Sequence, residues 1–127
     1  MLIKEFYKII SLTSEKTGIK AIIKLNPRHE VYKGHFPGQA VVPGVIQLQI
    51  IKEILEDHLS KKLFMENLSQ VKYLRPIIPD QNQTLVLNIH YNWEESKKLK
   101  TIVEVSALTS FEEHIFTKAK IKFSIVV

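Results

Sequence analysis

The sequence predicts an α+β fold in which a curved antiparallel sheet wraps around one long central helix. Only residues 43–59 carry the pattern of a long helix, and segments rich in β-branched and aromatic residues lie on both sides of it. The first half of this helix is apolar on nearly every side, so it should be buried along its length. A sheet that curves around the helix is the obvious cover.

The first third of the chain has the pattern of a β-hairpin. Residues 6–13 and 19–25 are rich in strand formers, and residues 14–18 between them supply turn chemistry. Pro27 then ends the second strand, because proline cannot donate a hydrogen bond to a ladder. Residues 29–42 show neither a helical nor a strand period of apolar residues, and glycine and proline are frequent among them. We expect an ordered loop there, and such loops often carry function.

The helix is expected from Pro43 to about Leu59. Proline suits the first helical turn, where its missing N–H group is not needed. Gln47 and Gln49 interrupt the apolar half of the helix. Each of these amides therefore requires a hydrogen-bonding partner, a pocket or a subunit interface.

The rest of the chain reads as an antiparallel meander. Alternation of apolar and polar residues marks the clearest strand, since one face of it would meet the core. The strands are expected at residues 68–74, 85–94, 98–109 and 114–126, with turns at 94–97 and 110–113. This element order is that of a hot-dog fold, formed by residues 1–127 as a single domain. A dimer that pairs two such sheets edge to edge would protect an exposed edge strand.

Composition narrows the function classes. The net charge of +5 comes from scattered lysines with only two arginines, so we expect no nucleic-acid binding. The chain has no cysteine, which excludes disulfides and thiolate chemistry. No run of about 18 apolar residues is present, so we expect no membrane span. The N-terminus is a poor secretory signal, which makes the cytoplasm the expected location.

Residues 34–49 are the most informative stretch. They put His35 on a loop a few residues before a helix that begins with free N–H groups at Gly44 and Val45. Such groups can hold a developing oxyanion, and a nearby histidine can take a proton from the carbon next to a thioester carbonyl. The alternative is a loop histidine that caps backbone groups, beside a helix that merely begins with Pro-Gly.

The motif resembles that of the FabA/FabZ-type 3-hydroxyacyl-[acyl-carrier-protein] dehydratases. His35-Phe36-Pro37-Gly38, four further residues and then Pro43-Gly44-Val45 is similar to the signature of that family. Residues 71–80 are similar to its strand that runs into an Arg-Pro turn. The resemblance covers nearly the whole chain and follows its element order.

The resemblance implies a role for each matched residue. His35 matches the catalytic histidine, and the N–H groups of Gly44 and Val45 match those that polarise the thioester carbonyl. Phe36 and Pro37 would help to fix the histidine. In the family the acyl chain lies in a tunnel at the dimer interface, which makes Ile46 and Ile50 tunnel candidates, although plain core is at least as good an interpretation.

One position departs from the family. Five residues after Gly44 the family has a carboxylic acid that assists departure of the β-hydroxyl, and this chain has Gln49. Glutamine cannot supply an acidic proton. Glu53 lies one turn further along the same helix face, where a solvated glutamate is the expected interpretation.

Three functions follow from this departure. The first is a dehydratase of fatty-acid or related polyene biosynthesis, in which Gln49 of the neighbouring subunit acts as a positioning group. The second is a non-catalytic acyl-thioester-binding subunit that pairs with an active relative. The third is a hot-dog thioesterase, although thioesterases of this fold also usually depend on a carboxylate.

The resemblance also implies partners. The substrate would be carried on the phosphopantetheine of an acyl carrier protein, with no other cofactor, and the protein would be a homodimer or a higher oligomer of dimers. Because acyl carrier proteins are acidic, Lys33, Lys72 and Arg75 are candidate contacts. The remaining histidines show no metal-ligand spacing and are expected on the surface or on strand faces.

Overall fold

The computed structural model describes residues 5–34, 38–95 and 101–126, which form two helices and six strands. In chain order these elements are β1 (Tyr7–Glu15), β2 (Gly18–Leu25), α1 (Val31–Gly34), α2 (Gly44–Leu59), β3 (Leu63–Tyr73), β4 (Thr84–Glu95), β5 (Thr101–Phe111) and β6 (His114–Ile125). The predicted hairpin and long helix are confirmed, and β4, β5 and β6 form the predicted meander. β3 does not join it next to β4, because it pairs with β6 at the far edge of the sheet.

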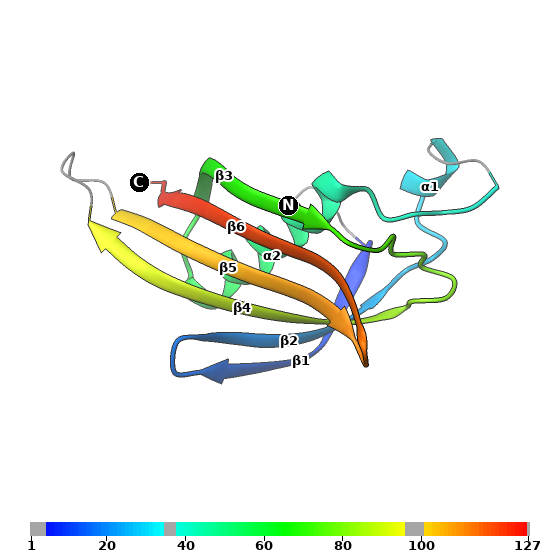
Figure 1. The fold of residues 1–127 in the computed structure, drawn as a ribbon, viewed down its shortest axis with the longest axis horizontal. Coiled ribbons are helices and arrows are strands. Elements are labelled where there is room, and N and C mark those ends of the chain that lie inside the picture. Colours follow the sequence, from blue (N-terminus) through cyan, green and yellow to red (C-terminus); the bar gives the residue numbers. More distant parts are fainter. Residues whose placement is uncertain (1–4, 35–37, 96–100, 127) are drawn as a thin grey trace.

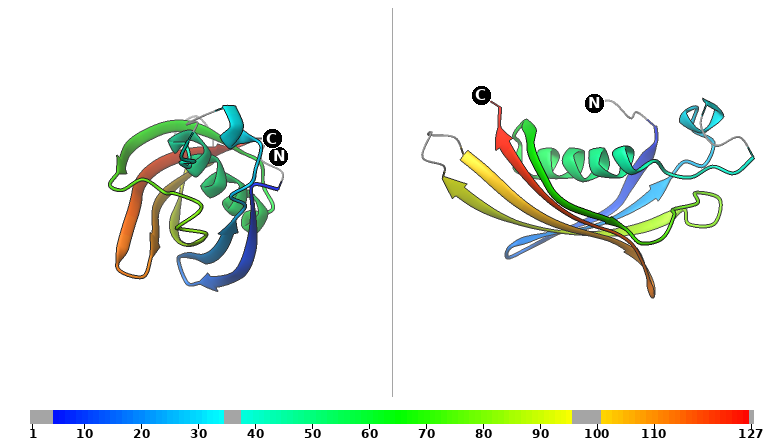
Figure 2. Two further views of the ribbon diagram at one scale, coloured as in Figure 1. Left: turned by 90° about the vertical axis from the view of Figure 1, so that its right-hand side faces the viewer. Right: turned by 45° about the horizontal axis from the view of Figure 1, so that its top comes forward.

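The six strands form one antiparallel sheet in the order β1-β2-β4-β5-β6-β3. The sheet is strongly curved, and α2 runs along its concave side (Figures 1 and 2). β1 and β3 are its two edges. This is the predicted hot-dog arrangement of a sheet around a helix.

The core lies between α2 and the concave face of the sheet. Strand residues alternate between this face and solvent, as the buried positions Leu85, Leu87 and Ile89 of β4 illustrate. From the helix side, Ile50, Ile51, Ile54 and Leu55 complete the core and are at most 2% exposed. The helix is therefore buried on the side that faces the sheet. The expected burial of its first half on nearly every side is only partly met, because Val45 in the first turn is 73% exposed.

Two details differ from the sequence-based expectation. The stretch at 29–42 contains a short helix, α1, because Tyr32 N–H and Lys33 N–H reach back to the carbonyls of His29 and Glu30. β3 begins at Leu63 instead of residue 68, because pairing with β6 imposes strand geometry on residues that show no alternation. Tertiary pairing overrides local propensity in this strand.

No helix among the described residues is both long enough and apolar enough to span a membrane.

Candidate active site

The beginning of α2 carries two backbone N–H groups that donate to no residue described by the structure. Pro43 occupies the N-cap position in an extended conformation and provides no side-chain hydrogen bond. Its carbonyl accepts from the N–H groups of Ile46 and Gln47, at 3.1 and 3.2 Å. The N–H groups of Gly44 and Val45 donate to no described residue, as is usual for a first helical turn without a cap. They point along the helix axis at the positive end of its dipole.

Tyr73, the last residue of β3, lies directly against this helix start. A Cβ atom built on Gly44 would be 2.5 Å from both Cζ and Oη of the tyrosine ring. Burial raises the pKa of Tyr73, so its hydroxyl stays a donor at neutral pH. The sequence identified Gly44 by its motif but gave no sign that Tyr73 would pack on it, because the contact depends on how the sheet curves around α2.

The predicted residues His35, Phe36 and Pro37 lie outside the described residues. Their assigned roles therefore stay predictions. Gly44 and Val45 are described, and both lie at the first turn of α2, where the motif required them. Val45 is 73% exposed, which leaves this end of the helix accessible to a ligand or a second subunit.

Gln49 lies in the second turn of the helix and is hydrogen-bonded to a neighbouring carboxylate. Its Nε2 donates a hydrogen bond of 3.1 Å to Oε2 of Glu53. The expectation that this glutamine needs a partner is confirmed. No described residue donates a hydrogen bond to Oε1 of Gln49.

Glu53 corrects the sequence-based expectation of a solvated glutamate. Its side chain is only 8% exposed, and its second carboxylate oxygen accepts a hydrogen bond of 3.1 Å from the hydroxyl of Tyr7. Tyr7 belongs to β1, which is far from α2 in sequence, so helix periodicity alone could not reveal this partner. A buried carboxylate is tolerated when hydrogen bonds replace its lost hydration.

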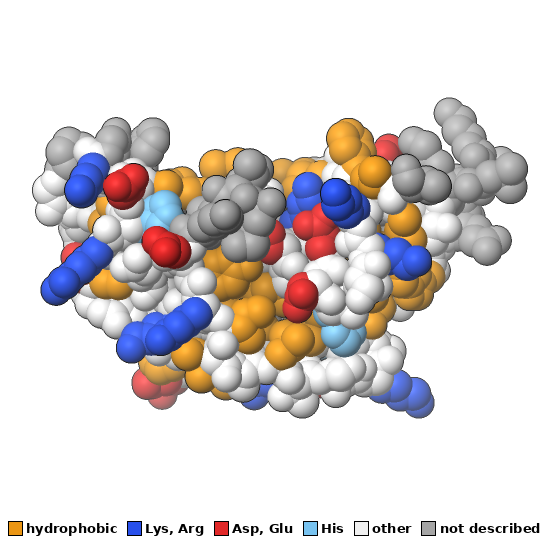
Figure 3. Space-filling view, turned by 180° about the vertical axis from the view of Figure 1, so that it is seen from behind, with side chains coloured by type: hydrophobic (Ala, Val, Ile, Leu, Met, Phe, Trp, Pro, Cys, Tyr) orange, Lys and Arg blue, Asp and Glu red, His pale blue; other side chains and the backbone are white. Residues whose placement is uncertain are grey.

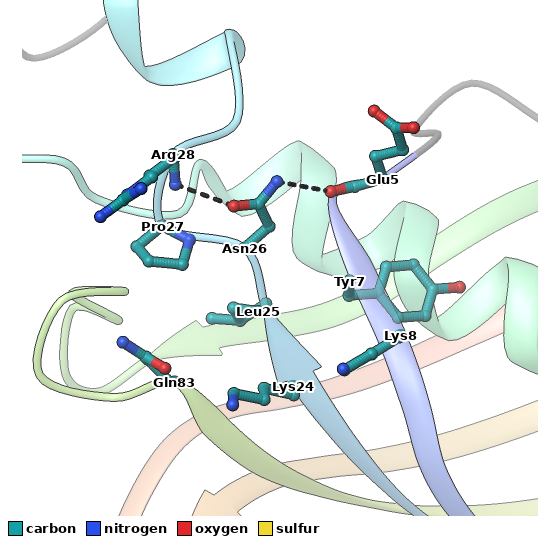
Figure 4. Close-up of a pocket in the computed structure, with 9 residues that line it drawn as sticks. All are labelled: Glu5, Tyr7, Lys8, Lys24, Leu25, Asn26, Pro27, Arg28 and Gln83. Carbon is teal, nitrogen blue, oxygen red and sulfur yellow. Dashed lines mark hydrogen bonds between the residues drawn. The ribbon is translucent and has the colours of Figure 1, made fainter.

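The Tyr7 side chain extends from β1 toward α2 (Figure 4). Burial and, after it, the charge of Glu53 raise the pKa of Tyr7. The phenol therefore remains protonated at neutral pH and donates to the carboxylate. Tyr7, Glu53 and Gln49 form a continuous polar chain from the edge of the sheet to the open face of the helix.

That open face carries a groove of about 570 Å³. Figure 3 shows the same side of the molecule, where hydrophobic side chains gather in the middle and charged side chains gather beside them. Gln49, Lys52, Glu53, Glu56 and Asp57 are among its lining residues. The groove places Gln49 and Glu53 where a ligand that crosses the helix could reach them.

The other helix glutamine is structural. Gln47 is 7% exposed, accepts a hydrogen bond from the Thr117 hydroxyl of β6 and donates one of 3.3 Å to the Val42 carbonyl. Ile50, a tunnel candidate, is 2% exposed. It lines a cavity of about 10 Å³, which is enough for about one water molecule and too small for an acyl chain. A tunnel role at a subunit interface stays a prediction for Ile46 and Ile50.

Two of the remaining described histidines have local structural contacts, and the other two are exposed. Nδ1 of His29 accepts a hydrogen bond from the N–H of Val31, and Nε2 of His58 lies 3.3 Å from the Tyr91 hydroxyl. His90 and His114 are exposed. Within the described ranges, no group of acidic and histidine side chains could hold a metal ion.

Known proteins are similar to this chain in sequence and in fold. The family model for ApeI-like proteins, described as ApeI dehydratase, matches residues 11–111. The 3-hydroxyacyl-[acyl-carrier-protein] dehydratase FabZ of Syntrophobacter fumaroxidans is 24% identical over 123 residues, which cover 90% of this chain and 78% of the relative. FabZ of Fusobacterium nucleatum is 22% identical and covers 93% of this chain and 83% of its own length.

Solved structures share the fold. The dehydratase heterocomplex ApeI:P from Xenorhabdus doucetiae contains a chain with a TM-score of 0.63 and 22% identity, covering 92% of this chain and 96% of that one. Thioesterase HI1161 from Haemophilus influenzae also has a TM-score of 0.63, at 13% identity, and covers 94% and 78% of the two chains. The hot-dog architecture thus accommodates both dehydratases and thioesterases.

Proposed function

This chain belongs to the ApeI-like dehydratase family, and from that premise we propose that it removes water from a 3-hydroxyacyl thioester carried on an acyl carrier protein. The product is the trans-2-enoyl thioester, as fatty-acid or related polyene biosynthesis requires. The observation that carries the proposal is the pair of free N–H groups at Gly44 and Val45, which follow the His35 motif in the sequence and begin a buried helix.

In the proposed reaction His35 takes the proton from C2 of the acyl chain. Negative charge moves to the thioester oxygen, where the N–H groups of Gly44 and Val45 stabilise it. The electron pair then forms the C2–C3 double bond as the C3–O bond breaks. His35 returns its proton to the departing hydroxyl, which leaves as water. Gln49 orients that hydroxyl and transfers no proton.

A direct test is to incubate the protein with a short 3-hydroxyacyl carrier protein and to follow loss of water by mass spectrometry. His35→Ala should abolish turnover. His114→Ala is the matched control, because this exposed histidine lies at the beginning of β6 and should leave activity unchanged. Equal inactivity of the wild type and His35→Ala would remove the basis for an enzyme.

We propose that the active form is a dimer that pairs through β3. This edge strand exposes Phe64, Leu68 and Tyr73, and it ends beside the start of α2. A second copy on this edge would cover those side chains and approach the site. Leu68→Glu should weaken the dimer in analytical ultracentrifugation, whereas Ile10→Glu on the opposite edge, β1, should leave it intact.

We further propose that the acidic carrier protein docks near the end of β3. Lys72 pairs in register with Lys118 of β6, and Arg75 follows two residues after the strand, so positive charge gathers without a described carboxylate partner. Lys33 is also exposed. Lys72→Glu should raise KM for a carrier-protein substrate but not for a small pantetheine thioester. Lys20→Glu on β2 makes the same charge change on another exposed strand position and should affect neither substrate.

The second candidate function is a non-catalytic subunit that binds acyl thioesters and pairs with an active relative. The observation that favours it is Gln49 at the position where the family has an acid. The dehydratase heterocomplex from Xenorhabdus doucetiae is a precedent for mixed assemblies of this fold. Under this alternative, the purified chain alone would be inactive and would gain activity with a carboxylate-bearing relative.

A further inference from the structure

Glu53 is the one described acidic side chain that is both buried and hydrogen-bonded from two different elements. Tyr7 donates to Oε1 from β1, and Gln49 donates to Oε2 from the preceding turn of α2, each at 3.1 Å. The carboxylate is 8% exposed, so water contributes little to it. Both carboxylate oxygens thus accept hydrogen bonds from protein donors, and every hydrogen bond in this network is donated toward Glu53.

That direction determines which end of the Gln49 amide is free. An ionised carboxylate only accepts hydrogen bonds, so the atom of Gln49 that faces Glu53 must be the donor, Nε2. The Oε1 atom is then the polar atom left for a ligand, since no described residue donates to it. Tyr7 strengthens this bias, because its hydroxyl holds the carboxylate from the other side.

We propose that Glu53 and Tyr7 are positioning residues that hold the Gln49 amide so that Oε1 accepts a hydrogen bond from the β-hydroxyl of the substrate. The inference rests on the proposed dehydratase function. A hydroxyl that donates to Oε1 has its lone pairs free, so it can accept the proton with which it leaves as water when the C3–O bond breaks. Gln49 therefore orients the leaving group, and the carboxylate that fixes it remains unconsumed in the reaction.

The network also accounts for an amide at position 49. Two carboxylates at hydrogen-bonding distance would repel each other unless they shared a proton. With Glu53 buried and already held by Tyr7, a glutamine is the side chain of the same length that complements it. The departure from the family acid and the buried Glu53 are thus two parts of one arrangement.

The test compares Glu53→Met with Glu113→Met. The first removes the acceptor and nearly preserves side-chain volume. The second makes the same change in the turn between β5 and β6, at an exposed carboxylate that does not line the groove and has no hydrogen bond to a described residue. Loss of orientation should lower kcat about tenfold and change KM by less than about twofold in Glu53→Met, because positioning acts on the reacting geometry. Glu113→Met should behave like the wild type.

Tyr7→Phe and the double variant Tyr7→Phe/Glu53→Met address folding. The single change should lower kcat less than Glu53→Met does, because Gln49 keeps its direct acceptor. The double variant removes the phenol hydroxyl and the carboxylate together, so only the half-buried Gln49 amide loses a partner, and the variant should retain the fold by circular dichroism and thermal unfolding. If it does so, a low kcat in this variant cannot be assigned to unfolding.

The orientation itself is measurable without substrate. In the nitrogen-15 NMR spectrum of the wild type, one Nε2 proton of Gln49 should be shifted downfield and exchange slowly, and Gln49→Ala identifies the signal. Glu53→Met should abolish both properties. A signal that is unchanged in Glu53→Met, or a kcat that is unchanged in an active and folded Glu53→Met protein, would overturn the positioning role. A wild type that dehydrates no substrate would instead overturn the proposed function, even where the NMR signal reports the hydrogen bond.

Discussion

The amide of Gln47 and the hydroxyl of Thr117 share a buried hydrogen bond between α2 and β6, across 70 residues of sequence. Both side chains are nearly inaccessible, at 7% and 1% exposed. The amide also donates to the Val42 carbonyl, just before the helix begins. This cluster fastens the first turns of α2, and therefore the Gly44 and Val45 N–H groups, to the sheet.

Thr117→Val should destabilise the protein by about 1–3 kcal/mol, because Oε1 of Gln47 would remain buried without a donor. Urea unfolding would measure the change. Thr109→Val is the control, since Thr109 pairs with Thr117 in register, is also buried and makes no hydrogen bond through its side chain to a described residue. Equal losses in the two variants would contradict the importance of this hydrogen bond.

Stability at high pH should report on Tyr7. Its pKa is raised in the folded protein by burial and by Glu53, so above about pH 10 the unfolded chain releases the phenolic proton while the folded chain keeps it. The unfolded state is then favoured, and stability that is fully present below about pH 10 falls as the pH rises. The decline between pH 9 and 11 should be shallower in Tyr7→Phe. Because Tyr32 and Tyr73 also have raised pKa values, only the difference from the wild type isolates Tyr7.

Gly44→Ala should displace the Tyr73 ring. The added Cβ would lie 2.5 Å from the end of that ring, which is half exposed and free to move outward. The stability change should stay within about 1 kcal/mol, because the helical preference of alanine offsets the lost contact. Dehydration should fall sharply, because the methyl group and the displaced ring crowd the helix start. In a Tyr73→Leu background, Gly44→Ala should stabilise the fold, and an unchanged effect there would contradict the contact.

Gly18→Ala should be more damaging to stability. Gly18 begins β2 where β2 pairs with β4, and an added Cβ would overlap the backbone carbonyl oxygen of Ile89. A backbone atom in a paired strand cannot swing aside as the Tyr73 ring can, so the two strands must separate locally. We expect a loss of about 1–3 kcal/mol in chemical unfolding, which is typical of overpacking. A loss smaller than that of Gly44→Ala would contradict this comparison.

Gln49→Glu should not simply restore the family acid. The introduced carboxyl group would meet Glu53 at hydrogen-bonding distance, and repulsion would raise its pKa above the usual value of about 4.3. The variant should therefore match the wild type in stability at pH 4 and become less stable than it as the pH rises toward 8. Thermal unfolding across this range measures the difference. A large gain in activity at pH 7 would instead favour the second candidate function, a non-catalytic subunit that pairs with an active relative.

The periodicity of apolar residues and the positions of proline and glycine were sufficient to predict most of the fold. The apolar first half of the helix, its Pro43-Gly44 start and the alternation in β4 predicted the helix, its burial against a sheet and the wrapping sheet itself. Two features could not be read locally. The first residues of β3 show no alternation and are held by β6, and α1 is a single turn whose hydrogen bonds depend on loop geometry.

The candidate site was only partly predictable. Motif spacing placed Gly44 and Val45 at the helix start, and burial of the helix implied partners for Gln47 and Gln49. The identities of those partners required the fold. Thr117, Tyr7 and Tyr73 come from three different strands, and Glu53 was expected in solvent because its β1 neighbour cannot be inferred from helix periodicity. Long-range polar contacts carry no local sequence signature.

The hydrogen bonds of Gln47 and Glu53 attach α2 to opposite flanks of the sheet, at β6 and at β1. Apolar contacts of isoleucine and leucine side chains alone would allow α2 to rotate about its own axis with little change in free energy, because dispersion contacts have no direction. Two directional tethers about 1.7 turns apart prevent such rolling. These two hydrogen bonds fix the direction in which every side chain of the helix points. A substitution that removes either one, at β6 or at β1, would therefore rotate the face of α2 that is turned away from the sheet.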